Sequence, residues 1–221
     1  FMGHPNGKGA ARVGYFDLTT VDAFHDIGQT DTWCSQMGCR LRWFPNPEGT
    51  HVAYNVLVDG THRTVIQDID DAADKTYLPM ALYDISRDGK FGLSLNFSRL
   101  GWLRAGYGYA VGGDPHDTDR CPKGEGVWHI DIATEQCTLI VSLDELVTIQ
   151  PSSSMTDAFH YINHIAINPS GTRFMFFHLW TRDPDDPGEW SCRMFTANID
   201  GSGLHLLEDK GIPSHYAWRS D

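Results

Sequence analysis

Apolar and polar residues alternate in a strand–turn–strand unit that recurs along this chain. Its copies are CRLRWFPNPEGTHVAYN (39–55), LYDISRDGKFGLSLN (82–96) and INHIAINPSGTRFMFFH (162–178), and SHYAWRSD (214–221) begins another. Each complete copy has an apolar run, a turn that contains glycine, and a second apolar run. Alternation of this kind is typical of half-buried β-strands, and the Pro, Asn, Asp, Ser and Gly between the runs favour tight turns.

Looser third and fourth runs follow each copy, over 62–70, 126–143 and 192–209. The segments 11–20 and 24–33 resemble such an outer pair alone. The third runs end in aspartates that favour turns, namely Asp17, Asp68 or Asp70, Asp131 and Asp200. A repeat of four short strands predicts the blade of a β-propeller, and therefore an all-β fold.

The repeat predicts one incomplete propeller domain over residues 1–221. The expected blades are 1–34 (partial), 35–80, 81–147, 160–210 and 211–221 (the start of the next). We therefore expect an arc of a larger propeller whose missing blades complete it. The long interval before the third copy is explained by insertions at 100–125 and 148–160, which composition indicates are loops, rather than by an extra blade.

Composition narrows the possible functions. The net charge of −12 argues against a nucleic-acid partner, because phosphate contacts need a basic face. No apolar run is long enough to predict a membrane span. The five cysteines form no C-x-x-C pair, so we expect mostly buried free thiols. Neither a G-x-S-x-G elbow nor a phosphate-binding loop occurs, and nothing indicates the compartment.

Polar residues recur at the ends of the predicted inner strands. Four begin the innermost strands, which line the channel of a propeller: Arg40, Tyr83, His164 and His215. Three close the second strands: Asn55, Asn96 and His178. One interpretation is a shared mouth in which His164, His178 and His215 hold a divalent metal. The alternative is that these residues satisfy backbone groups at tight turns.

The insertion that begins NFSRLGWLRAGYGY (96–109) mixes two arginines with aromatic residues. Arg99 and Arg104 could bind a carboxylate in bidentate fashion, while Tyr107 and its aromatic neighbours could stack on a sugar. Alternatively, the aromatic rings pack on a neighbouring blade, and the arginines pair with Asp114, Asp117 or Asp119.

The stretches HIAINPSGTRFMFFHLW, MFTANIDGSGLHLL and SHYAWRSD resemble the TolB-like, WD40-like propeller repeats of oligogalacturonate lyases and of related uronate lyases such as those acting on ulvan. The resemblance spans about residues 35–221. It implies a seven-bladed propeller with a divalent ion, usually manganese, and His164 matches one ligand. The ulvan-type enzymes imply a catalytic Tyr and Arg about one repeat apart, which Tyr83 and Arg99 match. Gln36 stands where that family has paired histidines.

The resulting hypothesis is β-elimination on an acidic, uronate-containing oligosaccharide or polysaccharide. Arg99 and Arg104 would neutralise the uronate carboxylate, Tyr83 would transfer the proton, and His164 would be a metal ligand or second base. The expected substrate contacts are Arg40, Asn55, Asn96, Tyr107 and Trp180. Two alternatives stay open: a non-catalytic TolB-like module that binds a protein or glycan, and a structural scaffold.

Overall fold

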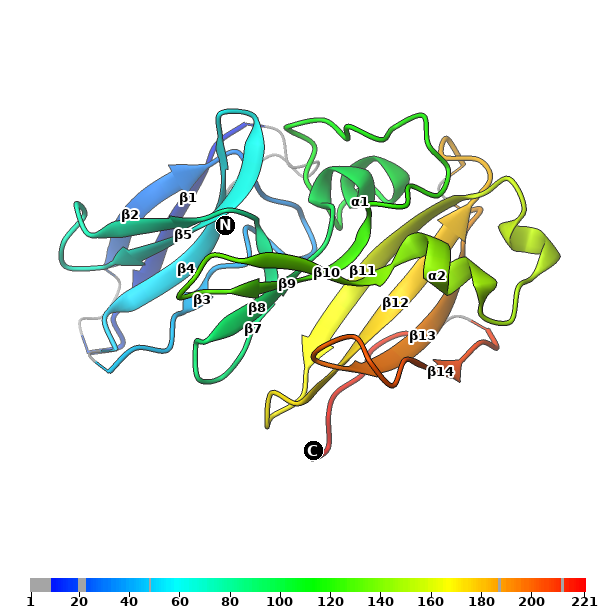
Figure 1. The fold of residues 1–221 in the computed structure, drawn as a ribbon. Helices are drawn as coiled ribbons and strands as arrows, with labels where there is room; N and C mark the ends of the chain where they lie inside the picture. The colour runs from blue at the N-terminus through cyan, green and yellow to red at the C-terminus, as the bar shows by residue number, and fades with distance from the viewer. Residues whose placement is uncertain (1–8, 20–22, 48, 187, 212) are drawn as a thin grey trace.

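The computed structural model describes residues 9–19, 23–47, 49–186, 188–211 and 213–221. Its strands form four antiparallel sheets that follow one another along the chain (Figure 1). The first sheet has two strands, β1 (Ala11–Phe16) and β2 (Phe24–Thr30). In each of the other sheets, the four strands lie side by side in chain order.

The three larger sheets each contain four strands. The second contains β3 (Arg42–Trp43), β4 (His51–Val58), β5 (Thr61–Asp68) and β6 (Lys75–Leu78). The third contains β7 (Leu82–Ile85), β8 (Phe91–Ser94), β9 (Gly126–Asp131) and β10 (Cys137–Ser142). The fourth contains β11 (Phe159–Ile167), β12 (Arg173–Thr181), β13 (Ser191–Asn198) and β14 (His205–Glu208).

The first strands of successive sheets are joined through Asp84 on β7. Its Oδ1 accepts a hydrogen bond from Arg42 Nη1 on β3 at 2.6 Å, and its Oδ2 accepts one from the Ile167 N–H on β11 at 2.8 Å. Four-stranded meanders joined along their first strands are the blades of a β-propeller. The chain is therefore an all-β propeller arc of three blades and a two-stranded partial one. The long interval in the repeat holds insertions and no further blade, as expected.

The turns between first and second strands share one geometry. In each, a glycine N–H donates to the carbonyl three residues earlier; the pairs are Gly49–Asn46, Gly89–Ser86 and Gly171–Asn168. The glycine φ angles are 71°, 69° and 71°. This left-handed conformation disfavours residues with a Cβ, which explains why the repeat carries glycine there.

The aspartates at the ends of the third strands also act as the sequence indicates. Asp17, Asp68, Asp131 and Asp200 each accept, through Oδ1, a backbone N–H two or three residues further on. These side-chain bonds close the turn that leads to the fourth strand.

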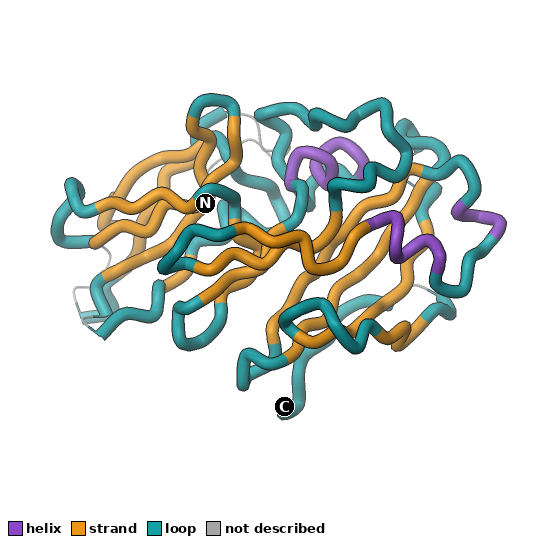
Figure 2. Tube along the Cα trace, in the orientation of Figure 1, coloured by secondary structure: helices purple, strands orange, loops and turns teal. Residues whose placement is uncertain are grey.

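Helical turns lie outside the sheets, in connections between strands (Figure 2). The helix α2 (Leu143–Thr148) follows β10, and the Ser142 side chain accepts the Glu145 N–H at its start. A short 3-10 turn, η1 (Ser153–Met155), follows. No helix in the described ranges is long and apolar enough to cross a bilayer.

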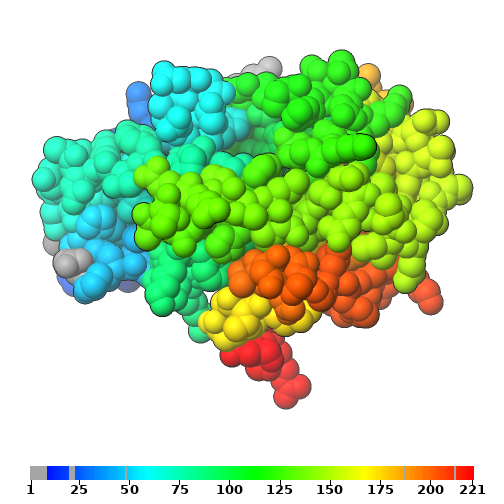
Figure 3. All heavy atoms as spheres, in the orientation of Figure 1, coloured from blue at the N-terminus to red at the C-terminus, as the bar shows by residue number. Residues whose placement is uncertain are grey.

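The helix α1 (Phe97–Leu103) was not predicted, because the region from residue 100 was interpreted as a loop. Its start is capped by Asn96, whose side chain accepts the Arg99 N–H at 2.9 Å. Seven residues are too few to be helical alone, so burial of Leu100 and its neighbours in the main core stabilises α1. In the all-atom view, the green segment that contains α1 and the insertion lies against the cyan β4–β5 turn (Figure 3). All five cysteines are free thiols, as expected.

Candidate functional site

A cavity of about 470 Å³ lies where the inner strands β7 and β11 approach the segments 36–42 and 214–216. We call it the axial cavity. Five of the residues predicted from the sequence line it: Arg40, Tyr83, Tyr107, His164 and His215. The structure thus brings together the polar residues that begin the innermost strands, together with one aromatic residue of the insertion.

Three of these residues share an uncommon backbone conformation. Arg40, His164 and His215 have φ angles of 60°, 53° and 54°, in the left-handed region that residues with a Cβ rarely adopt. In β11, the pairing register with β12 also shifts between Asn163 and Ala166. A bulge of this kind turns a side chain out of the strand's regular alternation. At these three positions, the left-handed conformation therefore turns the side chain toward the cavity.

Arg40 is the cation at the cavity wall. Its Nη2 donates to the Tyr83 carbonyl, and its guanidinium carbon lies 4.3 Å from the centre of the Tyr83 ring. Its Nε is buried without a hydrogen-bond partner. Among the described residues, no carboxylate forms a salt bridge with Arg40. The guanidinium is thus held in place without a salt-bridge partner in the described ranges.

Tyr83 is buried at 3% exposure, and its hydroxyl is engaged in the wall. The hydroxyl lies 2.8 Å from Met37 Sδ and 3.3 Å from Asn163 Oδ1, and it accepts the His164 N–H at 3.2 Å. Burial raises the pKa of Tyr83 to about 12. The phenol is therefore protonated at neutral pH, so that it can donate a proton but is a poor base.

His164 presents a neutral imidazole. The edges or faces of three aromatic rings surround it, with centroids 5.6 Å away for Tyr107, 5.1 Å for Phe177 and 6.2 Å for Tyr216. Burial, followed by the charges of Arg104 and Arg40, lowers the pKa of His164 to about 4. Two cations beside one neutral imidazole make this wall of the cavity electropositive.

His178 lies outside the axial cavity. It therefore does not join His164 and His215 in the metal site that we expected. Because strand side chains alternate, Phe177 points to His164 while His178 points to the other face of the sheet. Arg193 Nε donates to His178 Nδ1 at 3.2 Å, so His178 Nε2 carries the proton that bonds His160 Nδ1 at 2.9 Å. With both ring nitrogens occupied, His178 offers no lone pair to a metal.

Trp180 also belongs to this second, interior group. Its ring lies 5.4 Å from that of His178, and its Nε1 donates to Ser154 Oγ at 3.1 Å. At 7% exposure it presents no face on which a sugar could stack. Its predicted role in substrate binding therefore has no support in its position.

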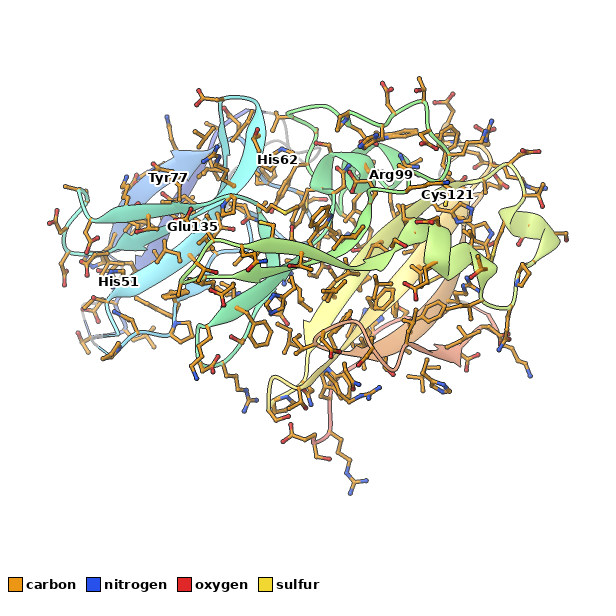
Figure 4. The ribbon with its side chains drawn as sticks, in the orientation of Figure 1. His51, His62, Tyr77, Arg99, Cys121 and Glu135 are labelled. Carbon is orange, nitrogen blue, oxygen red and sulfur yellow. The ribbon has the colours of Figure 1, made fainter. Side chains whose placement is uncertain are left out.

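Arg99 is buried and does not line the axial cavity, although it was expected to face the substrate. It is 1% exposed, and its guanidinium donates five hydrogen bonds. One contact is a salt bridge to Asp114 at 3.1 Å, and the others are backbone carbonyls of residues 116, 119, 120 and 160. The alternative interpretation, in which this arginine pairs with an insertion aspartate, describes what is observed (Figure 4).

Asn55 and Asn96 likewise satisfy neighbouring groups. Asn55 is 1% exposed, and its Nδ2 donates to the Leu82 carbonyl and to the Tyr109 hydroxyl. Asn96 caps α1 and donates from Nδ2 to Asp114 Oδ1. Both therefore satisfy neighbouring groups at the ends of strands, as the alternative interpretation predicted, and do not line a shared mouth.

Arg104 ends α1 beside the axial cavity. Its guanidinium carbon lies 3.8 Å from the centre of the Trp190 ring and 4.9 Å from that of Tyr107. It does not line the cavity, but its charge contributes to lowering the pKa of His164. Its effect on a ligand would be electrostatic, at longer range than that of Arg40.

The cavity also contains residues that were not selected from the sequence. Tyr216 donates its hydroxyl to the His164 carbonyl, Asp84 joins the inner strands, and Gln36 lines one side. Tyr216 could have been predicted from the sequence, because Tyr216 directly follows His215 in the copy SHYAW, where an inner strand was expected to start.

The possible metal donors of the described residues meet elsewhere. His51, Asp68 and Asp74 form the one group of at least three His, Cys, Asp or Glu side chains whose donor atoms lie within 4.8 Å of one another in the described ranges. Figure 4 shows His51 far from Arg99 and α1. The three histidines predicted to hold a metal together do not form such a group.

The fold and the cavity thus define a β-propeller with a polar, locally electropositive axial cavity. No protein-family model matches the chain, and no curated protein matches it. Among solved structures, it is similar to a putative TolB from Agrobacterium tumefaciens, with 16% identity, a TM-score of 0.43, and coverage of 75% of this chain and 48% of that one. It is also similar to an oligogalacturonate lyase in complex with manganese, with 13% identity, a TM-score of 0.49, and coverage of 90% and 47%.

A TolB from Acinetobacter baumannii is similar at 10% identity and a TM-score of 0.34, with coverage of 86% of this chain and 47% of that one. The chain therefore spans about half the length of these three structures. The resemblance is one of fold, and no functional residue is transferred from it.

Proposed function

We propose that the axial cavity binds an acidic oligosaccharide through the carboxylate of a uronate unit. The observation that carries this proposal is Arg40, a fixed guanidinium at the cavity wall that forms no salt bridge with the described carboxylates. Arginine binds carboxylates through paired, charge-assisted hydrogen bonds. A ligand carboxylate would supply the missing counter-charge.

The other walls support a sugar rather than a small inorganic anion. The volume of about 470 Å³ accommodates a monosaccharide unit or more. Tyr107 and Tyr216 provide aromatic surface, and His164 and His215 provide hydrogen-bonding groups suited to hydroxyls. The long-range charge of Arg104 adds to the attraction for an anion.

The test is a calorimetric titration with oligogalacturonate, compared with the methyl-esterified oligomer of the same length. We expect saturable binding of the acid form and at least ten-fold weaker binding of the ester. Arg40→Gln should weaken binding of the acid form at least ten-fold. Arg182→Gln, which removes an exposed arginine from another loop, is the matched control. Equal binding of acid and ester, or no effect of Arg40→Gln, would overturn the proposal.

A second candidate is β-elimination, and the proximity of Arg40, Tyr83 and His164 favours it. Arg40 would take the neutralising role expected of Arg99, because it faces the cavity. Tyr83, which is protonated, would supply the proton to the departing oxygen, and neutral His164 would remove the proton next to the carboxylate. Formation of unsaturated uronate product, measured by ultraviolet absorbance, tests this step separately from binding.

Among the described residues, the axial cavity offers few free donors for the manganese that the resemblance implied. Asp84, the carboxylate that lines it, already accepts bonds at both oxygens, from Arg42 and from the Ile167 N–H. Two histidines and a glutamine remain, and His51, Asp68 and Asp74 lie outside this cavity. We therefore derive no step of the proposed function through a metal.

A further inference from the structure

A second cavity, of about 550 Å³, lies on another part of the molecule. It is enclosed by the β4–β5 turn, the link from β6 to β7, the start of α1, and the insertion at 112–115. We call it the lateral cavity. Its polar or aromatic walls include His62, Asn96, Ser98, Asp114, Glu125 and Trp128. In Figure 3, the cyan β4–β5 turn stands beside the green insertion, and Figure 4 labels His62 in this region.

The two carboxylates of the lateral cavity differ in how their charge is compensated. Asp114 accepts bonds from Asn96 Nδ2 and the His116 N–H at Oδ1, and from Arg99 Nη1 and Trp102 Nε1 at Oδ2. It therefore has both a full cationic partner and saturated oxygens.

Glu125 has a longer ionic contact, to His116 in place of an arginine. Its Oε1 accepts a bond from Asn96 Nδ2 at 3.0 Å and lies 3.7 Å from His116 Nε2. Among the described residues, no lysine or arginine forms a salt bridge with it. The side chain is 13% exposed. Since Arg99 offsets Asp114, the cavity retains about one negative charge, located on Glu125.

The environment of Glu125 is unfavourable to that charge. Burial is the main reason that the pKa of Glu125 is raised, and the charge of Asp114 raises it further. A cation placed beside the carboxylate would reverse both effects. No lysine or arginine lines the cavity in the described ranges, and burial lowers the pKa of His62 to about 4, so that its imidazole is neutral.

The lateral cavity also has an aromatic wall suited to a cation. Trp128 lines it, and indole is the aromatic ring that attracts ammonium groups most strongly. Met80 and Leu95 add apolar surface for an alkyl chain. A carboxylate, an indole face and an apolar wall together match one class of ligand better than a sugar acid or a phosphate.

We propose that the lateral cavity binds an alkylammonium group, with Glu125 as its counter-ion and Trp128 as the ring beside it. This site is separate from the axial cavity and shares no lining residue with it. The opposite charge character of the two cavities predicts that they bind different ligands independently.

The probe is tetramethylammonium chloride, titrated by calorimetry at fixed ionic strength, with neutral tert-butanol as the uncharged counterpart. We expect saturable binding of tetramethylammonium and none of tert-butanol in the same range. Glu125→Gln should weaken binding at least ten-fold, and Trp128→Leu should weaken it several-fold. Glu145→Gln, at an exposed acid on α2, is the matched control and should bind as the unaltered chain does.

Three results would overturn the proposal: no saturable heat with tetramethylammonium, equal binding of tert-butanol, or unchanged binding by Glu125→Gln. Circular dichroism shows whether each variant is folded. If Glu125→Gln does not fold, Trp128→Leu tests the proposal instead, because this variant keeps the carboxylate and removes the aromatic ring. Unchanged binding by a folded Trp128→Leu would then overturn the assignment.

Discussion

Arg40, which lies just before β3, and His164, which lies at the bulge within β11, belong to different blades, and both have left-handed backbone conformations, with φ of 60° and 53°. Both side chains line the axial cavity. Strained conformations of this kind persist where the surrounding structure holds them, and they often occur at ligand sites. The blade-to-blade repetition of the strain is what gives the cavity its polar groups.

The strain at His164 can be measured by substitution. We expect His164→Asn to be more stable than His164→Val by about 1–2 kcal/mol, because Asn tolerates the left-handed region and a β-branched residue does not. Urea unfolding of the two variants measures the difference. Equal stabilities would show that the backbone relaxes and stores no strain there.

Arg99 should be essential for stability. We expect Arg99→Met to cost about 3–5 kcal/mol in the free energy of unfolding, because it leaves Asp114 buried and uncompensated and removes the donors to several carbonyls. Arg182→Met, which breaks an exposed salt bridge, should cost less than about 1 kcal/mol. Urea unfolding compares them, and similar losses would contradict the assigned role.

Stability should fall in mildly acidic solution. Burial lowers the pKa values of His62, His160 and His164 from 6.5 to about 4 in the folded chain. Between these values the unfolded chain binds more protons, so stability is complete above about pH 6.5 and is lost as the pH falls toward 4. The slope is at most about 1.4 kcal/mol per pH unit for each histidine.

Urea unfolding at several pH values across this window checks the effect. His164→Asn should reduce the slope, since it removes one of the three groups. A free energy of unfolding that does not change between about pH 7 and pH 5 would be inconsistent with neutral, buried histidines.

Binding of an acidic oligosaccharide should itself depend on pH. A bound carboxylate beside His164 raises the pKa of that imidazole, because it opposes the effect of Arg40 and Arg104. We expect tighter binding at about pH 5 than at pH 7, with proton uptake on binding. Calorimetry in buffers of different ionisation enthalpy measures that uptake. His164→Asn should abolish it, and unchanged uptake in that variant would exclude His164 as the proton acceptor.

Gly201 and Gly60 have similar backbone conformations, so replacing each by alanine distinguishes the cost of a steric clash from the cost of backbone strain. Gly201 has a φ of 85°, and a Cβ there would lie 2.0 Å from the Ile140 carbonyl oxygen of the neighbouring blade. Gly60 has a φ of 75° with nothing within 4 Å of such a Cβ. We expect Gly60→Ala to cost about 1 kcal/mol and Gly201→Ala at least twice that. Thermal unfolding compares the variants, and equal costs would mean that the blades separate without penalty.

The local rules of the repeat were readable in the sequence. The glycine turns and the aspartates that end third strands depend on bonds within a few residues, and each formed as predicted. The helix α1 was missed because its stability comes from burial of Leu100 in the core, which composition alone does not reveal.

The sequence by itself determined the all-β propeller blades, since alternation and turn chemistry act over a few residues. It did not determine where the inner strands begin, because β3 starts after Arg40 and β11 starts five residues before His164. Only the tertiary structure decided which polar side chains face a cavity. Arg40 and Arg99 carry the same charge, but Arg99 meets Asp114 and backbone carbonyls from distant segments, while Arg40 meets a ring and open space. The partners that distinguish them are brought near by folding, so their spacing along the chain gives no sign of the difference.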